Sequence, residues 1–153
     1  MKKGIVWFRN NLRVSDNECL VRALDECDEV LCVYILESRI WNTSSDPARM
    51  GSIRAKFILE SLKELEGEIN GLGGTIEFLQ GRSVDEIPKL MQKYGADVCY
   101  AQQEDAWEET EQERLLANQV NLVLTQGKGI WEEANLPFAL KDLPAVFSSF
   151  RRK

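Results

Sequence analysis

Two arginines and two asparagines follow the first apolar run of the chain. The run at residues 4–8 leads directly into Arg9, Asn10, Asn11 and Arg13. Guanidinium and amide groups donate hydrogen bonds, so this cluster is suited to holding an anion or a heteroaromatic ligand. The structural alternative is that the arginines form ion pairs with carboxylates at the edge of a sheet. The cluster contains no G-x-G-x-x-G pattern, and the dinucleotide fingerprint is therefore absent.

A second polar cluster follows the apolar run at residues 97–101. Gln102 and Gln103 carry amides that can bind the polar edge of a ring, and Glu104 can accept a hydrogen bond from a ring amine. The alternative is a solvated loop that leads into an acidic helix start, which the helix dipole favours. Arg54 lies in the first turn of a long predicted helix and points either to the same site or to solvent.

Missing residue types exclude several kinds of chemistry. The chain has no histidine, which excludes Ser-His-Asp and Cys-His nucleophiles and mixed Cys/His zinc sites. The sequence shows no P-loop, nucleophile–base pair or metal cluster, so we predict neither catalytic nor metal-binding residues. The four cysteines form no C-x-x-C pair, which indicates buried thiols in a reducing cytosol.

Charge and hydropathy narrow the range of partners. The formal net charge of -6 argues against tight autonomous binding to nucleic acid, which depends on phosphate neutralisation. No apolar run approaches the roughly 18 residues of a membrane span, and Arg9 interrupts the first run too early for a signal peptide. We therefore expect a cytoplasmic protein without direct DNA or membrane binding.

The elements that must position these clusters alternate along the chain. Strand-like apolar runs occupy residues 4–8, 30–36, 75–80, 97–101 and 121–127. Helical periodicity falls at residues 17–27, 52–70, 83–94 and 107–117. The alternation predicts an α/β, Rossmann-like fold, with a five-stranded parallel sheet and helices on both faces. The ends of the first and fourth strands then flank the switch point of the sheet, where such sheets bind ligands.

Local signals predict the helix ends and the helix faces. Ser15 or Asp16 is the expected N-cap of the first helix, and Ser83 with Glu86 is the expected capping box of the third. The predicted buried face of the first helix consists of Leu20, Val21, Ala23, Leu24 and Cys27. That of the long second helix consists of Ile53, Phe57, Ile58, Leu62, Leu65 and Ile69.

The alternation of strands and helices ends after residue 129. The remaining residues contain Pro137, Pro144 and several aromatic side chains, without another strand–helix unit. We predict an α/β domain at residues 1–129 and a C-terminal arm at residues 130–153.

Several segments resemble the N-terminal domain of the photolyase/cryptochrome family, most closely its DASH cryptochrome branch. The opening WFRNNLRVSDNECL is similar to the pattern W-F-R-x-D-L-R-x-x-D-N-x-x-L, and GSIRAKFILESLKEL is similar to G-x-x-R-x-x-F-L-x-E-S-L. Three further segments resemble the family in the same order: GRSVDEIPKL, AQQEDAWEETEQER and LPFALKDLPAVFSSFRRK. The resemblance spans essentially the whole chain.

The resemblance implies a domain that can hold a light-harvesting antenna, such as methenyltetrahydrofolate, a deazaflavin or a flavin. In the family, FAD, the lesion-binding DNA surface and the electron-transfer tryptophans belong to a helical domain that follows. This chain stops where that domain would begin, so we expect neither the helical FAD-binding domain nor FAD in its catalytic mode. Asn11 stands where the family has Asp, which weakens the expectation of interdomain docking.

The resemblance also ranks the candidate ligand-binding residues. Glu104 occupies the position of the acidic residue that contacts folate in DASH-like members. The other cofactor-binding candidates are chosen by their position at the same edge of the sheet: Arg9, Asn10, Glu37, Arg54, Gln102 and Gln103.

Three functions compete at this point. We expect a stand-alone, non-catalytic domain that binds a light-harvesting cofactor or a similar small ligand. The first alternative is a protein-interaction module that pairs with a separate flavin-bearing helical subunit or with a second copy of itself, motivated by the apolar arm. The second alternative is a Rossmann-like nucleotide-binding enzyme.

Overall fold

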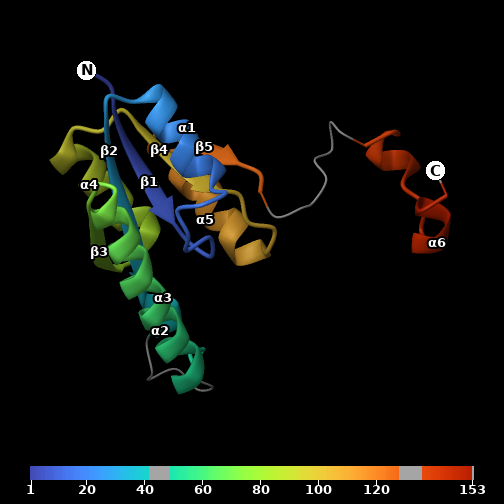
Figure 1. Cartoon of the computed structure of the whole chain (residues 1–153), viewed down its shortest axis with the longest axis horizontal. Coiled ribbons are helices and arrows are strands. Elements are labelled where there is room, and N and C mark those ends of the chain that lie inside the picture. The colour runs from blue at the N-terminus through green and yellow to red at the C-terminus, as the bar shows by residue number, and fades with distance from the viewer. Residues whose placement is uncertain (42–48, 128–135, 153) are drawn as a thin grey trace.

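A parallel sheet in the order β3-β2-β1-β4-β5 forms the centre of the structure, a computed structural model (Figure 1). The structure describes residues 1–41, 49–127 and 136–152. The strands are β1 (Lys3–Phe8), β2 (Glu29–Glu37), β3 (Ile76–Gly81), β4 (Val98–Gln102) and β5 (Leu122–Thr125). All four neighbouring pairs are parallel, which confirms the predicted sheet. Because β2 and β4 both pair with β1, the switch point lies where the sequence predicted it.

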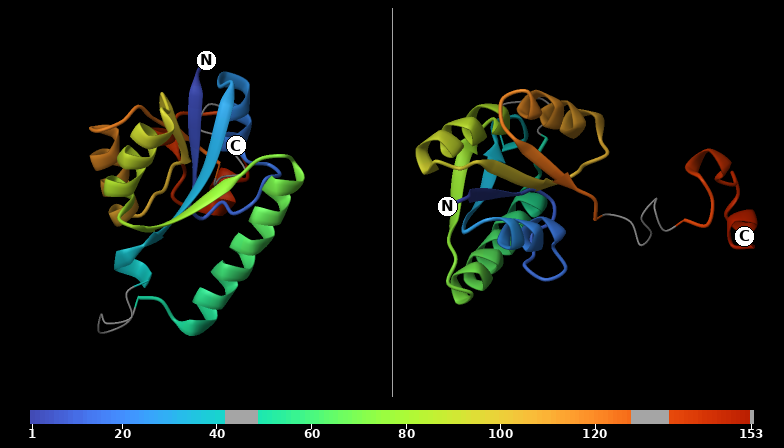
Figure 2. Two further views of the ribbon diagram at one scale, coloured as in Figure 1. Left: turned by 90° about the vertical axis from the view of Figure 1, so that its left-hand side faces the viewer. Right: turned by 90° about the horizontal axis from the view of Figure 1, so that it is seen from above.

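Helices cover both faces of the sheet, as expected (Figure 2). The main helices are α1 (Glu18–Glu26), α3 (Ser52–Gly71), α4 (Ser83–Tyr94) and α5 (Trp107–Ala117), and a short helix α2 (Ser38–Trp41) follows β2. One core packs α1 and α3 against the sheet, and it includes Cys19, Leu20, Ala23, Leu62, Leu65 and Ile69. The other core packs α4 and α5 against the opposite face, and it includes Ile87, Leu90, Met91 and Leu116.

The start of α1 differs from the prediction. Its N-cap is Asn17, whose side chain accepts a hydrogen bond from the N–H of Leu20 at 3.3 Å. Asp16, one of the expected caps, instead adopts a positive φ of 50° in the preceding turn. Val21 and Leu24 are exposed, so their assignment to the buried face was wrong. The buried face of α1 is narrower and follows Cys19, Leu20 and Ala23.

The long helix α3 is buried only in its second half. Leu62, Leu65 and Ile69 pack on the sheet, whereas Ile53 is 87% exposed and Phe57 is 68% exposed. The prediction of one continuous apolar face was therefore wrong for the first two turns. The physical reason is that the first half of α3 extends beyond the sheet (Figure 1), so no strand lies beneath it.

The predicted capping box of α4 is also wrong. The helix begins at Ser83 itself, its N-cap is Arg82, and the Oγ of Ser83 is buried without a hydrogen-bond partner among the described residues. A carboxylate from β2 supplies the missing acceptor, as described below. The end of α4 is as predicted, because Gly95 adopts the left-handed conformation with φ of 72°.

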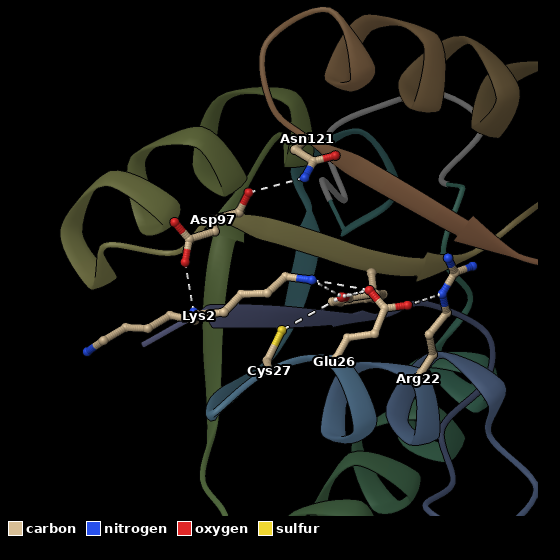
Figure 3. A network of polar contacts seen from close by, with 8 residues as sticks. Lys2, Arg22, Glu26, Cys27, Asp97 and Asn121 are labelled. Carbon is tan, nitrogen blue, oxygen red and sulfur yellow. Dashed lines mark hydrogen bonds and ion pairs between the residues drawn. The ribbon is translucent and has the colours of Figure 1, made fainter.

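A polar network closes the amino-terminal edge of the sheet (Figure 3). The carboxylate of Glu26 accepts hydrogen bonds from Tyr100 Oη at 2.8 Å, Lys2 Nζ at 3.2 Å and Arg22 Nε at 2.7 Å. These donors, led by Arg22, lower the pKa of Glu26 to about 2. The network therefore ties α1 to β4 and to the start of β1 at the edge opposite the predicted ligand site.

All four cysteines are free thiols. Cys19, Cys32 and Cys99 are buried, as predicted, whereas Cys27 is half-buried beside the polar network. The buried thiols belong to the two cores that hold the helices against the sheet.

The described part of the C-terminal arm lies apart from the sheet (Figure 1). It contains a 3-10 turn, η2 (Leu140–Asp142), and a short helix, α6 (Phe147–Phe150). The ring of Phe150 packs edge-on against Phe138 at 5.8 Å and is stacked with Phe147 at 6.1 Å. The predicted domain boundary at residues 129 and 130 lies outside the described residues. None of the helices described in the structure has the length and apolar character that crossing a bilayer requires.

Candidate functional site

A hollow lies at the carboxyl ends of β1 and β2, beneath α2, α3 and α5. Its volume is about 540 Å³, counting the space at its open mouth. Aromatic rings form part of the wall, from Trp7, Phe8, Tyr34 and Trp41. The polar groups on the wall belong to Arg9, Asn10, Glu37, Arg54, Glu109 and Gln112. An aromatic wall with a few polar groups is the usual lining of a site for a planar organic ligand.

Arg9 directly follows β1, and its side chain is only 6% exposed. Its Nη1 donates to the backbone oxygen of Gln102 at 3.2 Å and to Oε1 of Glu113, and its guanidinium carbon lies 4.5 Å from the centre of the Trp7 ring. The second terminal nitrogen, Nη2, is buried and has no hydrogen-bond partner among the described residues. Arg9 therefore lines the hollow as a buried arginine that its contacts hold in place.

Glu113 connects the two loops that flank the switch point. Its Oε1 accepts from Arg9, after β1, and from the N–H of Glu104, after β4, at 2.8 Å. Asn10 adds a second link by donating from Nδ2 to Oε1 of Glu104 at 3.0 Å. The loops after β1 and β4 thus lie side by side, as predicted, but their polar side chains bond to one another across the switch point.

Glu37 caps a helix from another element of the fold. Its Oε1 accepts from the N–H of Ser83, the first residue of α4, at 2.7 Å. A carboxylate is favourable there because the first N–H groups of a helix carry partial positive charge. Its other oxygen, Oε2, is buried without a hydrogen-bond partner in the described structure, and the nearest cation is Arg39 Nε at 3.9 Å. Glu37 therefore lines the hollow and also holds the start of α4 against the end of β2.

Tyr34 and Arg54 complete the polar wall. Burial raises the pKa of the Tyr34 phenol, the charge of Arg54 opposes that shift, and the charge of Glu37 adds to it. The phenol is consequently neutral at physiological pH and can donate a hydrogen bond. Arg54 is exposed at the mouth of the hollow, on the first turn of α3.

Four of the seven predicted ligand-binding residues line this hollow: Arg9, Asn10, Glu37 and Arg54. Gln102, Gln103 and Glu104 are not among its described lining residues. Gln102 contributes a backbone oxygen to Arg9, and the N–H of Gln103 donates to Thr125 at 2.8 Å. Glu104, the leading candidate, is only 4% exposed. A ligand-binding role for each of the seven residues stays a prediction.

The sequence analysis missed Glu113, because it considered only the acidic start of this helix and not its buried face. One signal was available in the helical spacing. Glu113 precedes Leu116 by three residues, so the two side chains lie on the same face, and both are buried. A carboxylate on the apolar face of a helix predicts a buried cationic partner.

Comparison with known proteins agrees with this architecture. Residues 4–153 match the family described as DNA photolyase. The chain is 34% identical to the blue-light photoreceptor PHR2 of Arabidopsis thaliana, over 99% of this chain and 35% of the relative. It is 32% identical to a DASH cryptochrome of the same plant, over 97% of this chain and 28% of the relative. The chain thus spans about a third of the length of these relatives.

Solved structures show the same fold. A Synechocystis cryptochrome matches with a TM-score of 0.88 and 27% identity, over 99% of this chain and 33% of that one. The photolyase of Sulfolobus tokodaii, solved with two FAD molecules, matches with a TM-score of 0.79 and 22% identity, over 98% of this chain and 34% of that one. From its sequence and its fold, the chain belongs to the DNA photolyase family and corresponds to the N-terminal α/β domain of that family.

Proposed function

We propose that this domain binds a light-harvesting chromophore in the hollow at the carboxyl ends of β1 and β2. The observation that carries the proposal is the composition of the wall, in which aromatic rings stand beside charged and amide side chains. The rings belong to Trp7, Phe8, Tyr34 and Trp41, and the polar side chains include Arg9, Asn10, Glu37 and Arg54. An apolar and aromatic wall with a few polar groups is typical of sites for planar organic ligands.

A flavin or a deazaflavin is the chromophore that this wall suits best. Its ring is planar and large enough to contact the aromatic side chains, and its edge combines carbonyl oxygens with an N–H group. The Sulfolobus tokodaii photolyase supports the choice, because that protein was solved with two FAD molecules, with the implication of a novel light-harvesting cofactor.

A folate at Glu104 is less favoured in this proposal. The carboxylate of Glu104 is buried and accepts a hydrogen bond from Asn10. A folate would have to displace Asn10 before its ring could reach that carboxylate.

In this proposal the domain collects light and carries out no chemistry itself. A chromophore held in a rigid aromatic wall passes excitation to a flavin elsewhere, on a separate helical unit. The resemblance to photolyases and cryptochromes is what supports this division of labour.

Ligand titration tests the proposal. Riboflavin, FMN, a deazaflavin and methenyltetrahydrofolate are each added to the purified protein, and binding is followed by ligand fluorescence and visible circular dichroism. We expect binding of a flavin or deazaflavin. Folded protein that binds none of the four ligands would refute the proposal, and binding of the folate alone would move the site toward Glu104.

A single substitution locates the site. Glu37→Gln keeps an oxygen for the N–H of Ser83 and removes the negative charge that Glu37 brings to the wall of the hollow. We expect it to weaken flavin binding by about tenfold, which corresponds to about 1.4 kcal/mol. Glu68→Gln, at an exposed position on α3, is the matched control and leaves the affinity unchanged.

The arm supports a second candidate function, that of an interaction module. Leu143, Val146 and Phe147 are all more than half exposed, and Phe147 reaches 73%. We expect such a surface to dock on a flavin-bearing helical protein or on a second copy of the chain. Sedimentation velocity, alone and after mixing with the helical remainder of the Synechocystis cryptochrome, measures both forms of association. Phe147→Ser weakens either form, whereas a monomer under both conditions excludes this function.

A further inference from the structure

The outward side of α1 carries two apolar side chains flanked by acids. Val21 and Leu24 are each more than half exposed, because the core packs against the opposite side of the helix. Glu18 and Asp25 are also exposed, and they lie on the same side as Val21, three residues before it and four residues after it. Neither acid takes part in an ion pair among the described residues. We call these four residues the acidic patch, an apolar surface with two carboxylates available for pairing.

The C-terminal arm carries side chains of the complementary kind. Leu143, Val146 and Phe147 are each more than half exposed. Arg151 and Arg152 follow them, are exposed, and take part in no ion pair among the described residues. The N–H of Arg151 donates to the backbone oxygen of Phe147 at 2.9 Å, so the two side chains are one helical turn apart. The arm therefore presents an apolar surface followed by a positive charge.

The arm does not cover the acidic patch of its own chain. Figures 1 and 2 show the arm apart from α1. In this conformation its apolar side chains face a neighbouring molecule, and a second copy supplies the patch and the arm in equal numbers. One contact of this kind joins only a few side chains, far fewer than the roughly 20–30 residues a side of a standard interface. A two-fold arrangement makes the contact twice, which favours reciprocal exchange.

We propose that the arm docks on the acidic patch of a second copy, in a two-fold dimer in which each arm covers α1 of the other copy. Phe147 packs on Val21 and Leu24, and the two arginines of the arm pair with the two acids of the patch. The spacing is matched, because Phe147 precedes Arg151 by four residues and Val21 precedes Asp25 by four. The inference deepens the second candidate function, since it names both the partner and the surface that the arm binds.

Charge reversal with compensation tests the inference. Sedimentation velocity gives the dimer dissociation constant of the full chain for wild type, for Glu18→Lys/Asp25→Lys and for Arg151→Glu/Arg152→Glu. We expect the dissociation constant to rise about tenfold or more in each variant, because like charges then face one another across the interface. The chain with all four substitutions has the net charge of wild type and opposite charges at the contact. We expect its dissociation constant to return to within about threefold of the wild-type value.

Two further variants separate the contact from other effects of substitution. Glu64→Lys/Glu68→Lys makes the same change of charge at exposed positions on α3, and we expect it to leave the dissociation constant unchanged. Val21→Ser/Leu24→Ser removes the apolar part of the patch. Both side chains are exposed in the monomer, so we expect the variant to fold as wild type does, as a circular dichroism melt can check, and to dimerise more weakly.

Three results would overturn the inference. The first is a dimer that the patch variants leave intact, and the second is a four-substitution chain that does not recover association. The third is a wild-type chain that stays monomeric. If the amides of α1 in that monomer exchange with solvent faster in Phe147→Ser than in wild type, the arm covers α1 of its own chain instead. A chain that stays monomeric alone but associates with the helical cryptochrome fragment overturns only this inference and leaves the second candidate function standing.

Discussion

Gln119 replaces a hydrogen bond that a proline removes from α4. Pro88 lies inside this helix and has no N–H to donate to the backbone oxygen of Val84, four residues earlier. Nε2 of Gln119, just after α5, donates to that oxygen at 3.1 Å. Gln119 therefore ties the end of α5 to the first turn of α4, the turn that Glu37 caps at the wall of the hollow.

The structure sets the size of the expected effect of Gln119→Ala. Val84 is buried, so its oxygen loses a partner in an apolar setting, which costs about 1–3 kcal/mol. Gln119 itself is exposed, so water can partly replace it, and the lower end of that range applies. We expect a loss of about 1 kcal/mol in the free energy of unfolding. Urea denaturation with an unchanged m-value measures it.

A second background tests the reasoning behind this number. Pro88→Ala restores an N–H that can donate to the Val84 oxygen within the helix, so Gln119→Ala then costs less than about 0.5 kcal/mol. The difference between the two backgrounds is a double-mutant cycle. Gln92→Ala, at an exposed position on α4, is the control and costs about the same in both backgrounds. An equal cost of Gln119→Ala in both backgrounds would show that the proline is not the reason for the contact.

Three further predictions concern the ion pair, the polar network and the thiols. Glu113→Gln leaves Arg9 buried without its counter-ion, so we expect the free energy of unfolding in urea to fall by about 3–5 kcal/mol. The double variant Arg9→Met/Glu113→Leu removes both charges and stays within about 1 kcal/mol of wild type. Similar losses in the two variants would contradict this reasoning. Because hydrogen bonds lower the pKa of Glu26 to about 2, its stabilising contribution is fully present above its ordinary pKa of 4.5. That contribution is lost as the pH falls from about 4.5 through about 2, so Glu26→Gln flattens the pH dependence of stability in that window, and an unchanged profile would count against the network. Burial raises the pKa of Cys99 to about 12, so we expect a thiol reagent to label Cys99 only after unfolding. Cys27 is half-buried, so we expect the reagent to label it in the native protein. Peptide mass spectrometry identifies the labelled cysteine in each state.

Local signals were sufficient to predict the order of the elements. The continuous apolar run in β2 and the left-handed Gly95 after α4 act within a few residues, so a single sequence reveals them. The cap of α4 could not be predicted in this way. Its acceptor is Glu37, 46 residues before Ser83, and only the parallel sheet brings the two together. Ser83 and Glu86 match the capping-box spacing, but the acceptor at this helix start is Glu37 from β2, which a local pattern does not reveal.

The sequence predicted where the candidate residues lie more successfully than it predicted which residues they contact. Topology alone placed Arg9 and Glu104 at the same edge of the sheet, because the carboxyl ends of parallel strands share one edge. Their partners depend on side-chain directions that the sequence does not reveal. Asn10, after β1, donates a hydrogen bond to Glu104, and Glu113, on α5, accepts one from Arg9.

The two interpretations of the arginine after β1, an ion pair or a ligand contact, are compatible. A guanidinium has five N–H donors, and the pair with Glu113 engages only one of its terminal nitrogens. An arginine buried to this degree without a carboxylate would destabilise the fold by several kcal/mol, about the cost of an uncompensated buried charge. The ion pair therefore makes it possible for Arg9 to be one of the residues that line the hollow while its side chain is only 6% exposed.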